Sequence, residues 1–170
     1  MPRITPNLWF DTRGEEAARY YCEIFPNSGI VDITRYGPAG PREEGSVMTV
    51  IFELDGHRFV ALNGGPELTF DEAVSLEVDC ADQAEVDYYW ARLSDGGQEN
   101  QCGWLTDRFG LSWQVVPRAL YELLGDPDTE TVRRVTTAML AMRKIDVAEL
   151  RRAAEERTAE EPAGQRTARA

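Results

Sequence analysis

Histidine is almost absent from this chain: a single one, His57, occurs in 170 residues. The three cysteines, Cys22, Cys80 and Cys102, are odd in number and lack the C-x-x-C spacing of redox or metal sites. A nucleophile needs a base, and with one histidine placed in an expected turn only a carboxylate such as Glu77 could serve. We therefore expect the cysteines to be small packed side chains in a reduced, cytoplasmic protein.

Positive charge and long apolar runs are also scarce. Eighteen Lys and Arg stand against thirty Asp and Glu, and the resulting net charge of −12 opposes binding to phosphate backbones or anionic lipid. No run reaches the ~18 apolar residues of a membrane span, and no charged and then apolar segment opens the chain. G-x-G-x-x-G and P-loop motifs are missing. We expect no nucleic acid, no membrane and no cofactor.

What the chain does contain is an internal repeat. A displacement of 68 positions aligns residues 8–29 with residues 76–97. The aligned segments share an opening leucine, an aspartate, two adjacent tyrosines and a closing glycine. Each segment reads as a strand, a short polar turn, a helix and a glycine-ended exit. The sequence therefore predicts two modules of similar structure.

Each module is expected to carry one helix with an apolar stripe. In the second, Asp82 and Glu85 form a capping box. Helical spacing then predicts these core-facing residues: Val86, Tyr89, Trp90 and Leu93 in the second helix, and Ala17, Ala18, Tyr21, Ile24 and Phe25 in the first. The aromatic side chains among them are interpreted as packing.

Strand-like runs follow each helix. In the first module they cover residues 30–36, 46–54 and 57–62, and Asp55-Gly56 is a two-residue hairpin signal. In the second module residues 98–107 and 111–116 read as strands. Asn63, before two glycines, is expected to form a turn. The pattern predicts tandem βαβββ modules, the second one trimmed.

The C-terminal part is different in kind. Asp126-Pro127-Asp128 is expected to start a helix, and its apolar residues are spaced for docking on the body or on a second subunit: Val132, Val135, Met139 and Met142. Asp146 with Glu149 predicts a further short helix. We place the paired modules at residues 1–125 (about 1–66 and 72–118), a helical extension at 126–156 and a disordered tail at 157–170.

Four motifs carry a family resemblance: ITPNLWFD (4–11), EEAARYYCEIFPNS (15–28), RFVALNGGP (58–66) and CGWLTDRFGLSWQVVP (102–117). With the two modules they resemble the PhnB-like group, also labelled 3-demethylubiquinone-9 3-methyltransferase, of the vicinal oxygen chelate superfamily. That superfamily includes glyoxalase I, extradiol dioxygenases and the bleomycin- and fosfomycin-resistance proteins. The resemblance, from Ile4 to about Leu150, implies an α+β fold whose tandem βαβββ modules form a curled mixed-sheet cup, with C-terminal helices. It further implies a homodimer with a small-molecule ligand inside the cup.

The resemblance also locates the four metal-ligand positions of the metal-using members, where a His and a Glu come from each module. These positions fall at Pro6 or Asn7, at Val60 or Ala61, within residues 73–75, and at Gln114. None carries a histidine or a carboxylate. An uncharged amide is a poor ligand for a divalent cation. We expect no bound metal.

Gln114 is a lone amide in an otherwise apolar strand. It is either a strand amide hydrogen-bonded within the protein or a contact to a ligand oxygen or a water inside the cup. Asn7 shares both interpretations, and Trp9 alternates with it onto the same face. Asn7, Trp9, Gln114 and the rim residue Trp104 are the predicted ligand-binding residues. Trp90 and Trp113 are interpreted as packing.

The first hypothesis is therefore a metal-free, PhnB-like small-molecule-binding protein. Its residues do not decide whether it is an enzyme, and they assign no catalytic residue. One alternative is a sequestering binder of a cationic ligand, similar to bleomycin-resistance proteins, which the acidic body favours. Another is a metal-dependent lyase, isomerase or dioxygenase, which the ligand positions oppose. Methyl transfer is not expected without a doubly wound sheet and a glycine-rich first loop.

Overall fold

The first module forms a mixed sheet covered by one helix. The computed structural model describes residues 4–156, so the tail predicted at 157–170 lies outside it. The elements of this module are β1 (Asn7–Phe10), α1 (Gly14–Ile24), β2 (Gly29–Arg35), β3 (Val47–Leu54) and β4 (His57–Asn63). The strand order is β1-β4-β3-β2, with β1 parallel to β4 and the other pairs antiparallel. We call it the first sheet.

The β3–β4 hairpin confirms the turn prediction. Asp55 and Gly56 both have positive φ, 44° and 76°, as a two-residue hairpin turn requires. The turn predicted at Asn63 is wrong, because Asn63 is the last residue of β4. Its buried side chain accepts a hydrogen bond from the Gly14 amide at 2.8 Å and donates one to the Val47 carbonyl at 3.1 Å. It therefore supplies the acceptor for the start of α1, which lacks a side-chain cap at Arg13.

The second module repeats the arrangement on a smaller scale. Its elements are β5 (Ser75–Cys80), α2 (Gln83–Leu93), β6 (Gln98–Glu99), β7 (Trp104–Thr106) and β8 (Ser112–Pro117). The order β5-β8-β7-β6, with β5 parallel to β8, matches the first sheet strand for strand. Asp82 caps α2 by accepting from the Glu85 amide, as predicted. The Glu85 carboxylate accepts from the Ala81 amide, one residue before the cap.

The strand expected over residues 98–107 is wrong as one element. The chain turns between β6 and β7, where Cys102 and Gly103 have positive φ of 59° and 81°. Their amides donate to the Met142 and Arg143 carbonyls at 2.8 and 2.7 Å. A contact with a distant part of the chain thus replaces strand pairing, which no local pattern could indicate.

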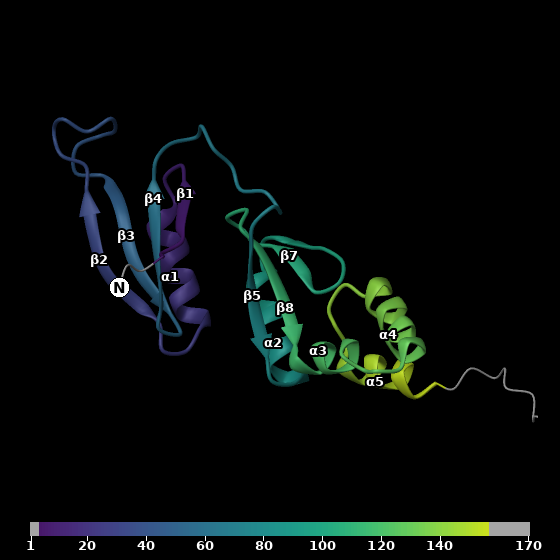
Figure 1. Cartoon of the computed structure of the whole chain (residues 1–170). Helices are drawn as coiled ribbons and strands as arrows, with labels where there is room; N and C mark the ends of the chain where they lie inside the picture. Colours follow the sequence, from purple (N-terminus) through teal and green to yellow (C-terminus); the bar gives the residue numbers. More distant parts are fainter. Residues whose placement is uncertain (1–3, 157–170) are drawn as a thin grey trace, which may run out of the picture.

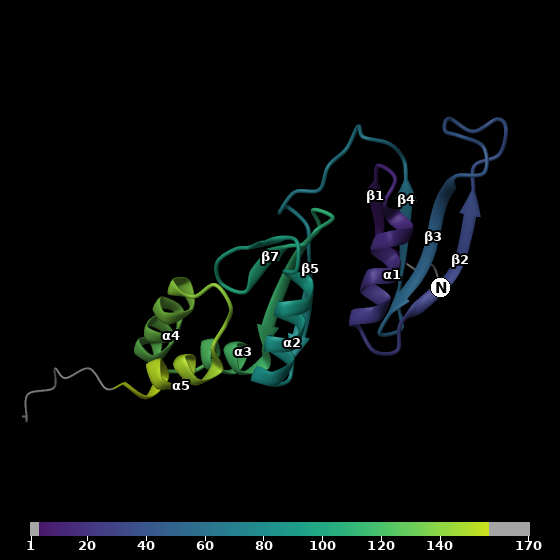
Figure 2. The ribbon, with the colours of Figure 1, turned by 180° about the vertical axis from the view of Figure 1, so that it is seen from behind.

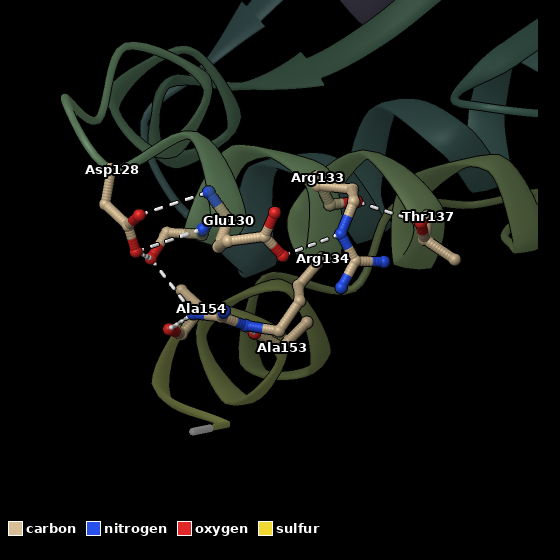
Figure 3. Close-up of polar contacts among 8 residues, drawn as sticks. Asp128, Glu130, Arg133, Arg134, Thr137, Ala153 and Ala154 are labelled. Carbon is tan, nitrogen blue, oxygen red and sulfur yellow. Dashed lines mark hydrogen bonds and ion pairs between the residues drawn. The ribbon is translucent and has the colours of Figure 1, made fainter. Parts of the chain in front are cut away.

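Three helices follow the second sheet: α3 (Arg118–Leu124), α4 (Thr129–Ala141) and α5 (Val147–Glu155). The prediction missed α3, although its apolar residues recur at helical spacing. Asp128 caps α4, and Arg134 donates to the last carbonyls of α5, at Ala153 and Ala154 (Figure 3). Val135, Met142, Ile145 and Leu150 pack on Val116 and Leu120, so the extension docks on its own chain. None of the helices in residues 4–156 could span a membrane.

The two modules share one core through α1. In both views α1 lies on the side of the first sheet that faces the second module, and α3 to α5 lie at the far end of the second sheet (Figures 1 and 2). Tyr21 contacts Trp113 with ring centroids 5.3 Å apart, and one cluster of buried residues spans both modules. The α+β class and the tandem modules are confirmed. The sheets are separate and uncurled, so one chain does not close a cup.

Candidate ligand-binding site

Within residues 4–156, alternation along the strands leaves the face of each sheet opposite α1 or α2 largely uncovered; on the second sheet the C-terminal helices cover that face only at Val116. In β8, Trp113 and Val115 are buried on the helix side, and Gln114 points to the other side, where it is half-buried. Trp104 and Glu77 are its register partners on the neighbouring strands. These three residues, with Ser75 and Thr106, are called the second-sheet face.

Gln114 is held in place on this face. Its Nε2 donates to the Ser75 hydroxyl at 2.9 Å. An amide has a second N–H and an acceptor oxygen, so this bond orients the group and leaves it capacity for another partner. Trp104 is half-buried beside it. The indole ring and the oriented amide together can receive a flat apolar group that carries a polar substituent.

Helix α3, which precedes the extension, adds a hydroxyl to the same face. Tyr121 of α3 donates to both carboxylate oxygens of Glu77 at 2.9 Å. That hydrogen bond is the main reason that the pKa of Tyr121 is raised, with burial and the Glu77 charge adding to it. Tyr121 is 54% exposed, so it can also be reached by a ligand. Glu77 is the acidic residue of this face, and Gln114 contributes an uncharged amide.

Asn7 and Trp9 lie on the corresponding face of the first sheet. Asn7 is exposed and pairs in register with Val60, and Trp9 pairs with Leu62. The Trp9 indole donates to the Gly65 carbonyl at 2.8 Å, and its ring covers Gly64, where a Cβ would lie 2.3 Å from it. Trp9 also lines a groove of about 410 Å³ with Phe70 and Phe109. We call Asn7, Trp9, Ile51, Val60 and Leu62 the first-sheet face.

The four predicted residues are thus brought together as two pairs. Trp104 and Gln114 are neighbours on the second-sheet face, and Asn7 and Trp9 share the first-sheet face. Two sheets separate the pairs within one chain. Trp90 and Trp113 are buried and donate to Glu99 and Asp107 at 2.8 Å each, as their interpretation as packing requires.

The positions where the resemblance places metal ligands are neighbours in space. Asn7 pairs with Val60, and Gln114 bonds to Ser75. Neither pair contains a histidine or a carboxylate. Within residues 4–156, no group of three or more His, Cys, Asp or Glu is placed to hold a metal ion. The donor set therefore does not fit a divalent cation, and we derive no metal-dependent step.

Cys22 and Cys80 are not placed for nucleophilic chemistry. Cys80 is fully buried, and burial, helped by the Glu85 and Asp79 charges, raises the pKa of its thiol to about 12. Burial also raises the pKa of Cys22. A thiol is reactive as its thiolate, so neither residue is a candidate nucleophile.

Asp107 is a buried carboxylate that the sequence did not indicate as a candidate site residue. It is 3% exposed and accepts from the Tyr21 hydroxyl, the Trp113 indole and the amides of Phe109 and Leu111. Burial raises its pKa, against the four hydrogen bonds that lower it. Because every donor belongs to the core or to its own turn, we assign it a structural role joining the modules.

Comparison with known proteins gives a consistent set of matches. Residues 2–116 match a family profile described as 3-demethylubiquinone-9 3-methyltransferase. The PhnB protein from Bacillus cereus is 34% identical over 68% of this chain and 99% of its own, with a TM-score of 0.63. Protein PA1353 from Pseudomonas aeruginosa is 20% identical over 69% and 98%, with a TM-score of 0.58. A search of curated proteins gave no match. The profile match ends before α3.

Proposed function

The chain belongs to the PhnB-like family of the vicinal oxygen chelate superfamily, and on this premise we propose that it binds a small, partly apolar molecule without a metal. The ligand contacts are Trp104 and Gln114 on the second-sheet face and Asn7 and Trp9 on the first-sheet face. The reaction, if the bound molecule is turned over, stays unassigned.

The chemistry of the second-sheet face is the observation that carries this proposal. Gln114 is oriented by Ser75 and lies between an indole ring and the Glu77 carboxylate. An oriented amide beside an aromatic surface is typical of small-molecule sites, where a few polar groups fix the orientation of an apolar body.

A second copy of the chain is proposed to complete the site. Ile51, Val60 and Leu62 leave half-buried apolar surface on the first-sheet face, and such surface is usually covered by a partner or ligand. The family resemblance implies a homodimer with the small-molecule ligand between its sheets. In a homodimer the first-sheet face of one copy can lie opposite the second-sheet face of the other, which would bring all four predicted residues to one cavity.

One alternative has a specific observation in its favour. The net charge of −12 favours a cationic ligand, so sequestration of a cation without turnover is the second candidate function. A metal-dependent lyase, isomerase or dioxygenase would need ligands other than those at the family positions. Methyl transfer is not proposed, because neither sheet has the doubly wound arrangement that usually holds the methyl donor.

The test begins with metal content, measured by mass spectrometry on untagged protein before and after incubation with nickel, zinc and manganese. We expect substoichiometric metal; near-stoichiometric metal would make the metalloenzyme alternative lead. Ligands found by thermal shift are then titrated against Gln114→Ala and Trp104→Ala, which should each weaken binding about tenfold. Leu140→Ala, an exposed position on α4, is the control. Unchanged binding to both site variants would reject the proposed contacts.

A further inference from the structure

A second cavity lies between the modules and meets the second-sheet face only at Glu77. It is a cleft of about 570 Å³, and none of Asn7, Trp9, Trp104 or Gln114 lines it. Its apolar wall consists of side chains from the helix side of both sheets and from the helices themselves: Phe25, Leu54, Phe59, Val78, Tyr89 and Trp113. We call it the inter-module cleft. It exists within one chain and needs no partner.

Three stacked rings form a platform along this cleft. The Phe25 ring lies between Tyr89 and Trp113, with centroids 5.1 and 5.5 Å away and interplanar angles of 19° and 21°. Trp113 is fixed by its bond to Asp107, and Phe25 and Tyr89 are half-buried. The stack is therefore ordered from beneath and reachable from above, as a preorganised apolar surface should be.

The rim of the cleft is acidic. Asp55, Glu77, Asp79 and Glu85 line it, against the basic residues His57 and Arg118. Arg118 is already paired with Asp79 at 2.9 Å. The pKa of Tyr89 is raised, first by burial and then by charges that include Glu85 and Asp55, which is the behaviour expected where the local potential is negative.

We propose that the inter-module cleft binds an organic monocation that has an aromatic or bulky apolar body. The apolar body would rest on the Phe25–Tyr89 stack, and the positive charge would lie near the ring faces and the rim carboxylates, where both attract it. An anion of the same shape would meet the same apolar wall and a repulsive rim. The inference does not depend on the proposed function of the sheet faces.

The test uses two probes with the same four phenyl groups and opposite charge, tetraphenylphosphonium and tetraphenylborate. Equilibrium dialysis of the full chain at low salt should show one phosphonium ion per chain and no comparable borate binding. Asp55→Asn keeps a residue that tolerates the positive φ of this turn and should weaken phosphonium binding about threefold. Glu44→Gln, which removes another exposed carboxylate, from the loop between β2 and β3, is the matched control and should have no effect.

Tyr89→Leu should weaken phosphonium binding about tenfold, since it removes a ring that attracts the cation. Circular dichroism checks that this variant is folded. If it is not, the test rests on Asp55→Asn. Equal binding of the borate would overturn the proposal. So would phosphonium binding that is insensitive to Asp55→Asn and weakened instead by Trp104→Ala, an outcome that would place the cation on the second-sheet face and support the proposed function there.

Discussion

Asp107 shows how much of this molecule depends on a single buried carboxylate. Four donors converge on it, and one of them, the Tyr21 hydroxyl at 2.7 Å, comes from the other module. A buried carboxylate that loses a donor keeps its desolvation cost without the compensating bond. The bond between Tyr21 and Asp107 is therefore a link between the modules as well as a core contact.

Replacement of Tyr21 by Phe is expected to lower the free energy of unfolding by about 1–2 kcal/mol, because the ring packing stays and one hydrogen bond to a charged group is lost. The matched control is Tyr121→Phe, which removes a hydroxyl from a mostly exposed tyrosine and should change stability by less than about 0.5 kcal/mol. Urea unfolding followed by fluorescence measures both. Equal effects of the two variants would contradict the linking role of Asp107.

Asp107 also predicts a pH dependence. Its pKa is raised in the folded protein from the ordinary 3.8, so the folded state holds this proton to a higher pH than the unfolded state does. The contribution to stability is full below the ordinary pKa and is lost as the pH rises through the raised value. The advantage in unfolding free energy of wild type over Asp107→Asn should therefore shrink as the pH rises above the ordinary carboxyl pKa. A difference that grows would mean that the hydrogen bonds outweigh burial.

Single residues differ in how far their roles follow from neighbouring positions in the sequence. The alternation around Gln114 correctly separated its side chain from Trp113, because strand period is a local property. Asn63 was expected in a turn, and its role as acceptor for the start of α1 depends on a residue 49 positions away. Whether Gln114 contacts a ligand stays a prediction.

At the scale of elements, α4 and α5 are joined by one arginine. Arg134 donates to Ala153 and Ala154 at the end of α5 (Figure 3). It also donates to Thr131, which in turn donates to Asp128. The last carbonyls of a helix lack intrahelical partners and carry partial negative charge. A guanidinium at this place satisfies them and fixes the end of α5 against α4.

We expect Arg134→Ala to destabilise the extension by about 1–2 kcal/mol and to increase hydrogen exchange in α5. Arg133 is the neighbouring control: its side chain is exposed and pairs with Glu130 at 2.8 Å on the same helix, so Arg133→Ala should cost less than about 0.5 kcal/mol. Hydrogen exchange by mass spectrometry resolves the two. Equal protection of α5 in both variants would show that Arg134 does not hold it.

Most of the helices and strands could be predicted from local sequence patterns. The helices α1 and α2, the β3–β4 hairpin and the cap at Asp128 each depend on residues within a few positions of one another, and each is present. The interruption between β6 and β7 was not accessible, since it results from amides that bond to the segment after α4. The alternation of residues along a strand contains no information about a hydrogen-bond acceptor 40 residues away, such as Met142 for Cys102.

For the whole molecule, the proposal of paired sheet faces requires a dimer. Light scattering at micromolar concentration should give twice the chain mass of 19.1 kDa. Ile51→Asp should shift the measured mass toward that of one chain, because the new charge on the first-sheet face would be buried in the interface. Val31→Asp, exposed on β2 with a side chain that is 50% accessible, is the control. A mass of one chain for the wild type at that concentration would reject the dimer.

The sequence by itself determined the repeat, the α+β class, the tandem modules and the acidic charge, because these follow from local periodicity and composition. It also determined that the family ligand positions carry no histidine or carboxylate. Only the tertiary structure decided how the modules join, through Tyr21 and Asp107, and that Tyr121 donates to Glu77 on the second-sheet face. It alone revealed the inter-module cleft. These features arise where segments distant in the chain meet, and packing between such segments leaves no period in the sequence.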